Sequence, residues 1–117
     1  MIKFYQYPKC TTCKKASKWL TDNEVPFESV NIVENTPTAS ELKGVYNKSK
    51  LRLKRFFNTS GQKYRELGLK DKVDQMTDDD IFALLATDGM LIKRPLAFDD
   101  EKITLGFKED NYENYWN

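Results

Sequence analysis

The sequence predicts a single domain of the α/β class. Three observations predict it: strand, helix and strand patterns follow one another within the first 33 residues, helical segments fill the middle, and a hairpin with a short helix closes the chain. Strands that alternate with helices in this way are typical of a sheet covered by helices. The 117 residues suffice for one hydrophobic core and not for two.

The N-terminal segment has the pattern of a βαβ unit. Residues 2–7 and 25–33 predict strands, the second entered through Pro26, and residues 13–23 predict the helix between them. Strands joined in this way lie parallel, with a right-handed crossover. The turn after the first strand therefore lies where open α/β sheets place their sites. The helix's predicted inner face consists of Cys13, Ala16, Trp19 and Leu20.

The middle of the chain predicts three further helices. Thr38 begins the first, with Glu41 completing a capping box, and residues 59–67 form the second. Thr77 caps the third, whose first turn holds Asp78–Asp80, where the helix dipole favours negative charge. That position explains the acidic triplet without a metal ion. The predicted buried stripes are Leu42, Val45 and Tyr46 on the first helix and Ile81, Leu84 and Leu85 on the third.

The C-terminal segment contains a proline within an apolar run. Residues 89–98 have strand character, but Pro95 lacks the N–H group that a sheet ladder needs. Two interpretations stay open: an edge strand, or a cis Arg94–Pro95 bond that turns main-chain groups toward the cysteine turn. Residues 102–107 predict the last strand and 109–116 a closing helix.

Both cysteines of the chain, Cys10 and Cys13, lie in the turn after the first strand with the spacing C-x-x-C. A thiol at a helix N-terminus faces unpaired backbone N–H groups and the positive end of the helix dipole, which stabilise its thiolate. The thiolate is the form that attacks disulfides. The spacing and its strand–turn–helix context therefore predict a redox centre.

The two sulfurs are predicted to differ. Cys10 precedes the helix and has no helical neighbours to cover it, whereas Cys13 shares the apolar helix face. We therefore assign Cys10 as the exposed nucleophile and Cys13 as the buried resolving thiol. Groups placed to stabilise the Cys10 thiolate are the ammonium groups of Lys9, Lys14 and Lys15 and the hydroxyls of Thr11 and Thr12.

A zinc site, a structural disulfide and a pair of unrelated thiols are the alternatives to a redox centre. A structural zinc site needs four ligands, and the chain has two cysteines and no histidine. A structural disulfide across so short a loop restricts the unfolded chain little. Two unrelated buried thiols remain an alternative, because free cysteine is among the most buried residue types.

Composition limits the partners and the compartment. Nineteen basic and eighteen acidic residues give a net charge of +1, which predicts no general attraction to nucleic acid or membranes. Residues 50–57 are the most basic segment, for which a solvated face is the favoured interpretation and nucleic-acid binding the alternative. No signal region or membrane-length apolar run occurs, so we expect a cytoplasmic protein, where a C-x-x-C pair is more often catalytic or redox-sensing than structural.

The sequence resembles the arsenate reductase (ArsC) and Spx family over nearly its whole length. The segments that carry the resemblance are residues 7–13, 64–69, 91–95 and 105–107. It implies a thioredoxin-like (glutaredoxin-like) fold, with a mixed four-stranded sheet and a helical insertion between the second and third strands. Residues 1–117 then form a single domain, in which 1–34 and 90–117 supply the sheet-forming core and 36–89 the insertion.

The same resemblance implies roles for individual residues. Cys10 matches the family's redox-active cysteine, Pro95 its cis-proline, and Arg94 an arginine close to the reactive sulfur that can pair with an oxyanion. The chain departs from arsenate reductases where Ser60 and Phe107 occupy the places of further arginines. Arg52, Arg55 and Arg65 are possible substitutes. Cys13 is a second departure from those reductases, and it fits the Spx-like pattern.

Two functional hypotheses follow. In the first, the protein is a cytosolic thiol–disulfide oxidoreductase, with arsenate reduction as a sub-hypothesis; it binds no cofactor or metal and uses an external thiol reductant such as thioredoxin, glutaredoxin or glutathione. In the second, it is a Spx-like redox-sensing regulator that binds the α subunit of RNA polymerase rather than nucleic acid. A member with inert thiols is a third alternative. We expect a monomer in each case.

Overall fold

The computed structural model describes all residues from Met1 to Asn117. The chain forms two compact units, the first made of residues 1–31 and 94–117 and the second of residues 32–93. No helix has both the length and the apolar character needed to cross a membrane.

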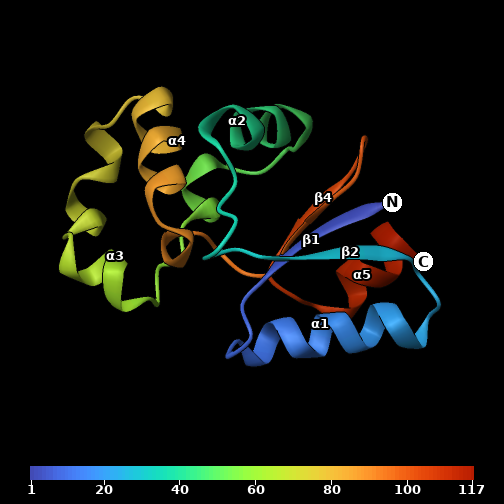
Figure 1. Cartoon of the computed structure of the whole chain (residues 1–117). Helices are drawn as coiled ribbons and strands as arrows, with labels where there is room; N and C mark the ends of the chain where they lie inside the picture. The colour runs from blue at the N-terminus through green and yellow to red at the C-terminus, as the bar shows by residue number, and fades with distance from the viewer. The chain divides into compact units, whose positions relative to one another are not determined.

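The first unit contains a mixed four-stranded sheet (Figure 1). Its strands are β1 (Ile2–Gln6), β2 (Phe27–Asn31), β3 (Leu96–Phe98) and β4 (Ile103–Leu105), in the spatial order β2-β1-β3-β4. β1 pairs parallel with β2 and antiparallel with β3, and β3 pairs antiparallel with β4. This sheet has the strand directions that the sequence predicts for a βαβ unit followed by a hairpin.

Helices α1 (Thr11–Asp22) and α5 (Glu109–Trp116) pack against one face of this sheet (Figure 1). Trp19 of α1 and Tyr112 of α5 meet edge to face, with ring centroids 5.5 Å apart. The Trp116 indole N–H donates a hydrogen bond to the buried Thr104 hydroxyl, 3.0 Å away. The buried residues of this core are Ile2, Phe4, Ala16, Trp19, Leu20, Ala97, Tyr112 and Trp116.

Several element boundaries in the first unit differ from the prediction by one or two residues; the last strand, for example, covers residues 103–105 rather than 102–107. Helix α1 begins at Thr11 rather than residue 13, because Cys10 itself occupies the N-cap position and apolar spacing says nothing about the first helical turn. Strand β2 covers residues 27–31 rather than 25–33. Val25 is excluded because its N–H bonds the Leu20 carbonyl, 2.9 Å away, and therefore closes the end of the helix.

The second unit consists of helices α2 (Ala39–Lys48), α3 (Gln62–Glu66) and α4 (Asp78–Thr87), joined by 3₁₀ turns (Figure 1). The Thr38 hydroxyl caps α2 by accepting the N–H of Glu41 at 3.1 Å, as predicted. A full capping box forms at α4, where Thr77 and Asp80 exchange side-chain and backbone hydrogen bonds. The 3₁₀ turns cover Leu53–Phe56, Leu69–Asp71, Val73–Gln75 and Gly89–Leu91.

The buried face of α4 differs in one position from the predicted stripe. Ile81 and Leu85 are buried, but Phe82 is buried in place of Leu84, which is half-buried. Tyr46 of α2 contacts the Phe82 ring, with centroids 5.7 Å apart, and the Phe56 ring at 6.0 Å. The buried face of α4 is therefore turned toward Phe82, whose ring packs on Tyr46. The spacing of apolar residues along the sequence does not reveal this contact.

The basic segment of this unit is a solvated face. Arg52, Lys54 and Arg55 are exposed, whereas the apolar residues between and after them, Leu53 and Phe56, are buried. Lys54 forms an ion pair with Asp74. This arrangement supports the favoured interpretation of the segment, because its apolar side chains build the core of the unit.

The apolar run at residues 89–98 is mostly not a strand. Residues 89–91 form a 3₁₀ turn, Ile92 makes an isolated antiparallel bridge with Phe57, and only residues 96–98 join the sheet. The Arg94–Pro95 peptide bond is cis, which confirms the cis interpretation of this proline over the edge-strand one.

Two glycines of the second unit provide a matched test of its packing. A Cβ on Gly89 would lie 2.7 Å from the Ile32 carbonyl carbon, and nearer still to its oxygen, whereas a Cβ on Gly44 in α2 would contact nothing within 4 Å. We expect Gly89→Ala to lower the free energy of unfolding by about 1–3 kcal/mol through overpacking. Gly44→Ala should raise it by up to about 1 kcal/mol, because alanine favours helices.

Urea denaturation followed by circular dichroism measures both variants. Equal effects of the two substitutions would contradict the close approach of residues 32 and 89.

Candidate redox-active site

The two cysteines lie at the junction of β1 and α1. The Cys10 N–H bonds the Tyr7 carbonyl at 3.0 Å, which closes the turn, and the Cys10 carbonyl accepts the Lys14 N–H at 3.1 Å, which opens the helix. The Cys10 sulfur accepts a hydrogen bond from the Cys13 backbone N–H, with N and Sγ 3.1 Å apart. The sulfur therefore takes the place that a serine or aspartate oxygen usually takes at a helix N-cap.

The two thiols differ in exposure and in chemistry. Both are free; Cys10 is half-buried, whereas Cys13 is only 2% exposed. Burial raises the pKa of the Cys13 thiol from 9.0 to about 12, and its hydrogen bond with the Cys10 side chain contributes in the same direction. Cys13 is therefore a neutral thiol at neutral pH. Together Cys10 and Cys13 form a CxxC centre in which only one sulfur reaches solvent.

Arg94 and Pro95 belong to the same unit as the two cysteines. The Arg94 guanidinium stacks over the Tyr7 ring, with its central carbon 5.7 Å from the ring centroid. Its positive charge acts against burial and lowers the pKa of Cys13, so it lies within electrostatic reach of the thiols. The Pro95 carbonyl accepts the Gly106 N–H at 2.9 Å, which ties the proline to the end of β4.

The hydroxyls of Thr11 and Thr12, which the sequence suggested as hydrogen-bond donors to the Cys10 sulfur, do not form that bond. Thr11 and Thr12 are exposed in the first turn of α1, and the hydrogen bond that reaches the Cys10 sulfur comes from the Cys13 backbone instead of their hydroxyls. The backbone wins because N-cap geometry aims an N–H directly at the cap atom. Lys9, Lys14 and Lys15 are exposed as well.

Tyr7 and Tyr112 are two aromatic residues for which the sequence suggested no role at the site. The only signal for Tyr7 was its position next to Pro8 in the segment before Cys10. Tyr112 is fully buried, and its hydroxyl makes no hydrogen bond. Burial raises the pKa of Tyr112 to about 12; the neighbouring Thr104 hydroxyl lowers it and the nearby Cys13 raises it further. Periodicity predicts that Tyr112 is buried but not that it lies near Cys13.

The residues at the places of the family's further arginines, Ser60 and Phe107, carry no charge. Phe107 packs on Tyr112, with ring centroids 4.8 Å apart, as part of the apolar core of the first unit. Ser60, Arg52, Arg55 and Arg65 are exposed residues of the second unit. No three His, Cys, Asp or Glu side chains lie close enough together to form a metal-binding group.

The sheet order, the N-capping cysteine and the cis-proline define a thioredoxin-like protein with a dithiol centre. The model of the ArsC family matches residues 5–115. The chain therefore belongs to the ArsC family.

Relatives and solved structures agree with this assignment. The uncharacterized protein YusI of Bacillus subtilis is 56% identical over 115 residues, which cover 98% of each chain. The crystal structure of an ArsC family related protein from Bacteroides fragilis has a TM-score of 0.93 and 45% identity, and covers 97% of this chain and 95% of that one. A possible arsenate reductase from Streptococcus mutans has a TM-score of 0.89 and 46% identity, with 97% and 98% covered.

Regulators are also similar to this chain. The global transcriptional regulator Spx 1 of Lactococcus lactis is 30% identical over 110 residues, which cover 94% of this chain and 84% of the relative. The regulatory protein MgsR of Bacillus subtilis is 29% identical over 106 residues, with 91% and 82% covered. The family around this chain thus includes named regulators as well as structures named for arsenate reduction.

Alkylation should distinguish the two cysteines. We expect iodoacetamide to modify Cys10 of the native reduced protein at least about tenfold faster than Cys13, because Cys13 is buried and protonated. Mass spectrometry of peptides from timed samples measures the two rates, and Cys10→Ser and Cys13→Ser variants confirm the assignment. Equal rates would contradict the buried position of Cys13.

Alkaline pH should destabilise the fold through Cys13. Its pKa is raised in the folded state, so its contribution to stability is complete below pH 9, the unfolded value, and is lost as the pH rises toward about 12. We expect the free energy of unfolding to fall by up to about 1 kcal/mol per pH unit in this range. Urea unfolding at a series of pH values measures the slope.

Cys13→Ala is the matched control for that slope. It retains Tyr112, whose pKa is raised in the same direction, so its stability should fall less steeply with pH without becoming flat. A slope identical to that of the wild type would show that Cys13 ionises equally in both states.

Proposed function

We propose that the protein is a thiol–disulfide oxidoreductase in which Cys10 is the nucleophile and Cys13 the resolving thiol. The observation that carries the proposal is the contact between the two: a half-buried Cys10 sulfur accepts the Cys13 N–H at 3.1 Å while the Cys13 thiol is buried beside it. An N–H donor at a helix N-terminus stabilises negative charge on sulfur. The neutral, buried thiol of Cys13 takes part only in the second exchange of the reaction.

The proposed reaction has two exchanges. The Cys10 thiolate attacks one sulfur of a substrate disulfide, so that a Cys10–substrate bond forms, the substrate disulfide breaks, and the leaving thiolate takes up a proton. Cys13 then loses its proton and attacks the Cys10 sulfur, which releases the second substrate thiol. The substrate gains two electrons, and the protein is left with a Cys10–Cys13 disulfide. An external dithiol such as thioredoxin or glutaredoxin, or glutathione, restores both thiols.

The neighbouring residues support the charge changes of these steps. Arg94 lowers the pKa of Cys13 and so favours its ionisation in the second exchange. Thr11 and Thr12 occupy the first turn of α1, directly after Cys10. A reducing cytoplasm is the compartment in which the dithiol form would be maintained.

Arsenate reduction is a narrower form of this proposal. It is supported by the 46% identity to a Streptococcus mutans structure named as a possible arsenate reductase. Arg94 supplies one guanidinium for an oxyanion. With Phe107 packed in the core and no further arginine in the first unit, we propose that disulfides are better substrates than arsenate.

Turnover of a small disulfide tests the proposal. With hydroxyethyl disulfide, thioredoxin, thioredoxin reductase and NADPH, we expect activity from the wild type above the background of the recycling enzymes. Cys10→Ser should abolish that activity, because the attacking thiolate is lost. Cys13→Ser should retain the first exchange and accumulate a mixed disulfide, visible as a mass increase equal to one substrate thiol.

The same assays with glutaredoxin and glutathione, and with arsenate, cover the other reductants and the other substrate. If no combination gives turnover, and Cys10→Ser behaves as the wild type does throughout, the oxidoreductase proposal fails.

A redox-switched regulator is the second candidate, favoured by the 30% identity to Spx 1 and the 29% identity to MgsR. In this candidate a Cys10–Cys13 disulfide changes the surface that binds the α subunit of RNA polymerase. Co-purification of the α subunit with the oxidised and the reduced protein separates the candidates. Binding that depends on redox state supports the regulator, and failure in both states removes it.

A further inference from the structure

A groove of about 450 Å³ opens beside the redox centre, within the first unit. Its volume lies in the range of small-ligand sites. Four of its residues come from α1 at the spacing i, i+1, i+4 and i+5, which is one face of a helix. The groove is lined by Phe4, Gln6, Pro8, Cys13, Lys14, Ser17, Lys18 and Ser29.

The sheet side of the groove comes from β1 and the edge strand β2. Phe4 and Ser29 are directly paired in the parallel ladder, so they project from the same sheet face. That is the face covered by α1, and Phe4 belongs to its core. Ser29 is nevertheless exposed, so α1 does not cover β2 at this position. The groove occupies the space between the helix and the edge of the sheet.

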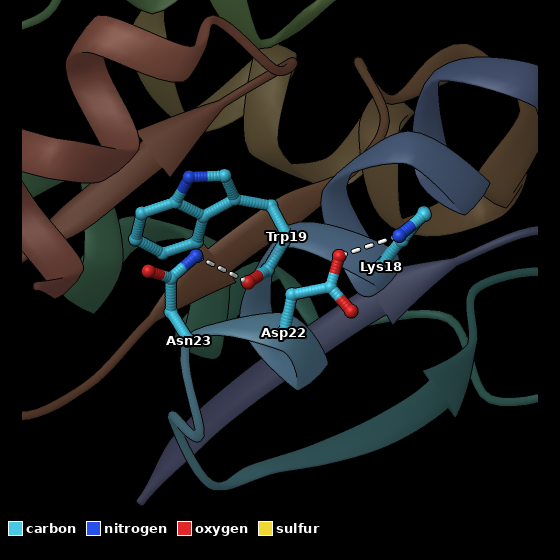
Figure 2. A network of polar contacts seen from close by, with 4 residues as sticks. All are labelled: Lys18, Trp19, Asp22 and Asn23. Atoms are coloured by element: carbon cyan, nitrogen blue, oxygen red, sulfur yellow. Dashed lines mark hydrogen bonds and ion pairs between the residues drawn. The ribbon is translucent and has the colours of Figure 1, made fainter.

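The lining carries positive charge and no carboxylate. Lys14 is exposed, and its side-chain ammonium makes no hydrogen bond or ion pair, so its charge is unpaired. Lys18 is paired with Asp22, with Nζ and Oδ2 2.5 Å apart, on the exposed side of α1 (Figure 2). On β2, Glu28 alternates with Ser29 and therefore projects from the opposite sheet face. Lys14 is therefore the unpaired cation of the groove lining.

The other polar groups of the groove suit the same kind of ligand. Ser17 and Ser29 supply hydroxyls and Gln6 an amide, all of which can donate hydrogen bonds to carboxylate oxygens. Phe4 and Pro8 add an apolar surface on which the methylene groups of a side chain can lie. The groove thus combines one unpaired cation, Lys14, with neutral donors, which distinguishes it from an isolated surface lysine.

The groove is adjacent to the reacting sulfur but does not contain it. Cys13 lines the groove and Cys10 does not, yet the Cys13 N–H is 3.1 Å from the Cys10 sulfur. A substrate chain joined to Cys10 in the mixed disulfide would therefore have its neighbouring residues within reach of the groove. A ligand there would sit beside the resolving thiol during the second exchange.

We propose that this groove binds an acidic side chain next to the disulfide cysteine of a protein substrate, with Lys14 as the specificity-determining cation. The inference rests on the proposed oxidoreductase function and names its substrate class: disulfides flanked by glutamate or aspartate. Lys14 acts on the encounter and on the orientation of the substrate chain, and the chemistry at Cys10 is unchanged.

Activated peptide disulfides test the proposal in a single step. Short peptides carry one cysteine as a 2-thiopyridyl disulfide, flanked on both sides by glutamate, glutamine or lysine. Attack by Cys10 on the peptide sulfur releases 2-thiopyridone, whose absorbance gives the rate. We expect the wild type to react about threefold to fivefold faster with the glutamate peptide than with the glutamine peptide, the size of one partly exposed ion pair.

Lys14→Glu and Lys15→Glu form the matched pair of variants. Both side chains are exposed on α1 and change the net charge equally, but only Lys14 lines the groove. Because each change also alters the field at Cys10, the quantity compared is the ratio of the glutamate to the glutamine rate within one variant. Lys14→Glu should lower this ratio below one and favour the lysine peptide, whereas Lys15→Glu should keep the wild-type preference.

Salt supplies a further readout, since the preference should disappear at about 1 M NaCl, where the Debye length is about 3 Å. Equal ratios in Lys14→Glu and Lys15→Glu, or no preference in the wild type, would overturn the groove inference while leaving the oxidoreductase function intact. Failure of all three peptides to react with the wild type would instead overturn the proposed function itself.

Discussion

The hydrogen bond from the Cys13 backbone N–H to the Cys10 sulfur connects the fold of this protein to its chemistry. This bond depends on three local features: β1 ends at Gln6, the turn is closed by the Cys10 N–H bonding the Tyr7 carbonyl, and α1 begins at Thr11. Together they place the Cys10 sulfur at the N-cap position of α1. A helix N-terminus leaves N–H groups without intrahelical partners. The Cys10 sulfur satisfies one of these N–H groups, so the same contact caps α1 and fixes the position of the sulfur at the start of the helix.

The difference between the two thiols arises from packing. Cys13 lies on the face of α1 that continues through Ala16 and Leu20 into the core, and burial keeps it neutral, with a pKa of about 12. Arg94 opposes that effect from the segment before β3. A residue distant in the sequence therefore helps to set the pKa of the Cys13 thiol.

The chain is similar both to a structure named as a possible arsenate reductase and to named regulators, Spx 1 and MgsR. Phe107 occupies a place where the resemblance to arsenate reductases implies an arginine. Its aromatic ring packs on Tyr112 and carries no charge with which to bind an oxyanion. The groove beside Cys13 adds a charged surface whose lining residues all belong to the first unit.

The sequence by itself determined the order of the elements, the place of the cysteines at a strand–helix junction, the helix starts at Thr38 and Thr77, and the burial of Cys13, because each depends on contacts within a few residues of the chain. Only the tertiary structure decided that Phe82 replaces Leu84 in the buried face of α4 and that Arg94 lies over Tyr7. It also brought Tyr112 near Cys13 and Ser29 opposite α1. These outcomes depend on how segments distant in the sequence pack together. Hydrophobic periodicity shows which face of a helix or strand is buried, but not which residues pack against that face.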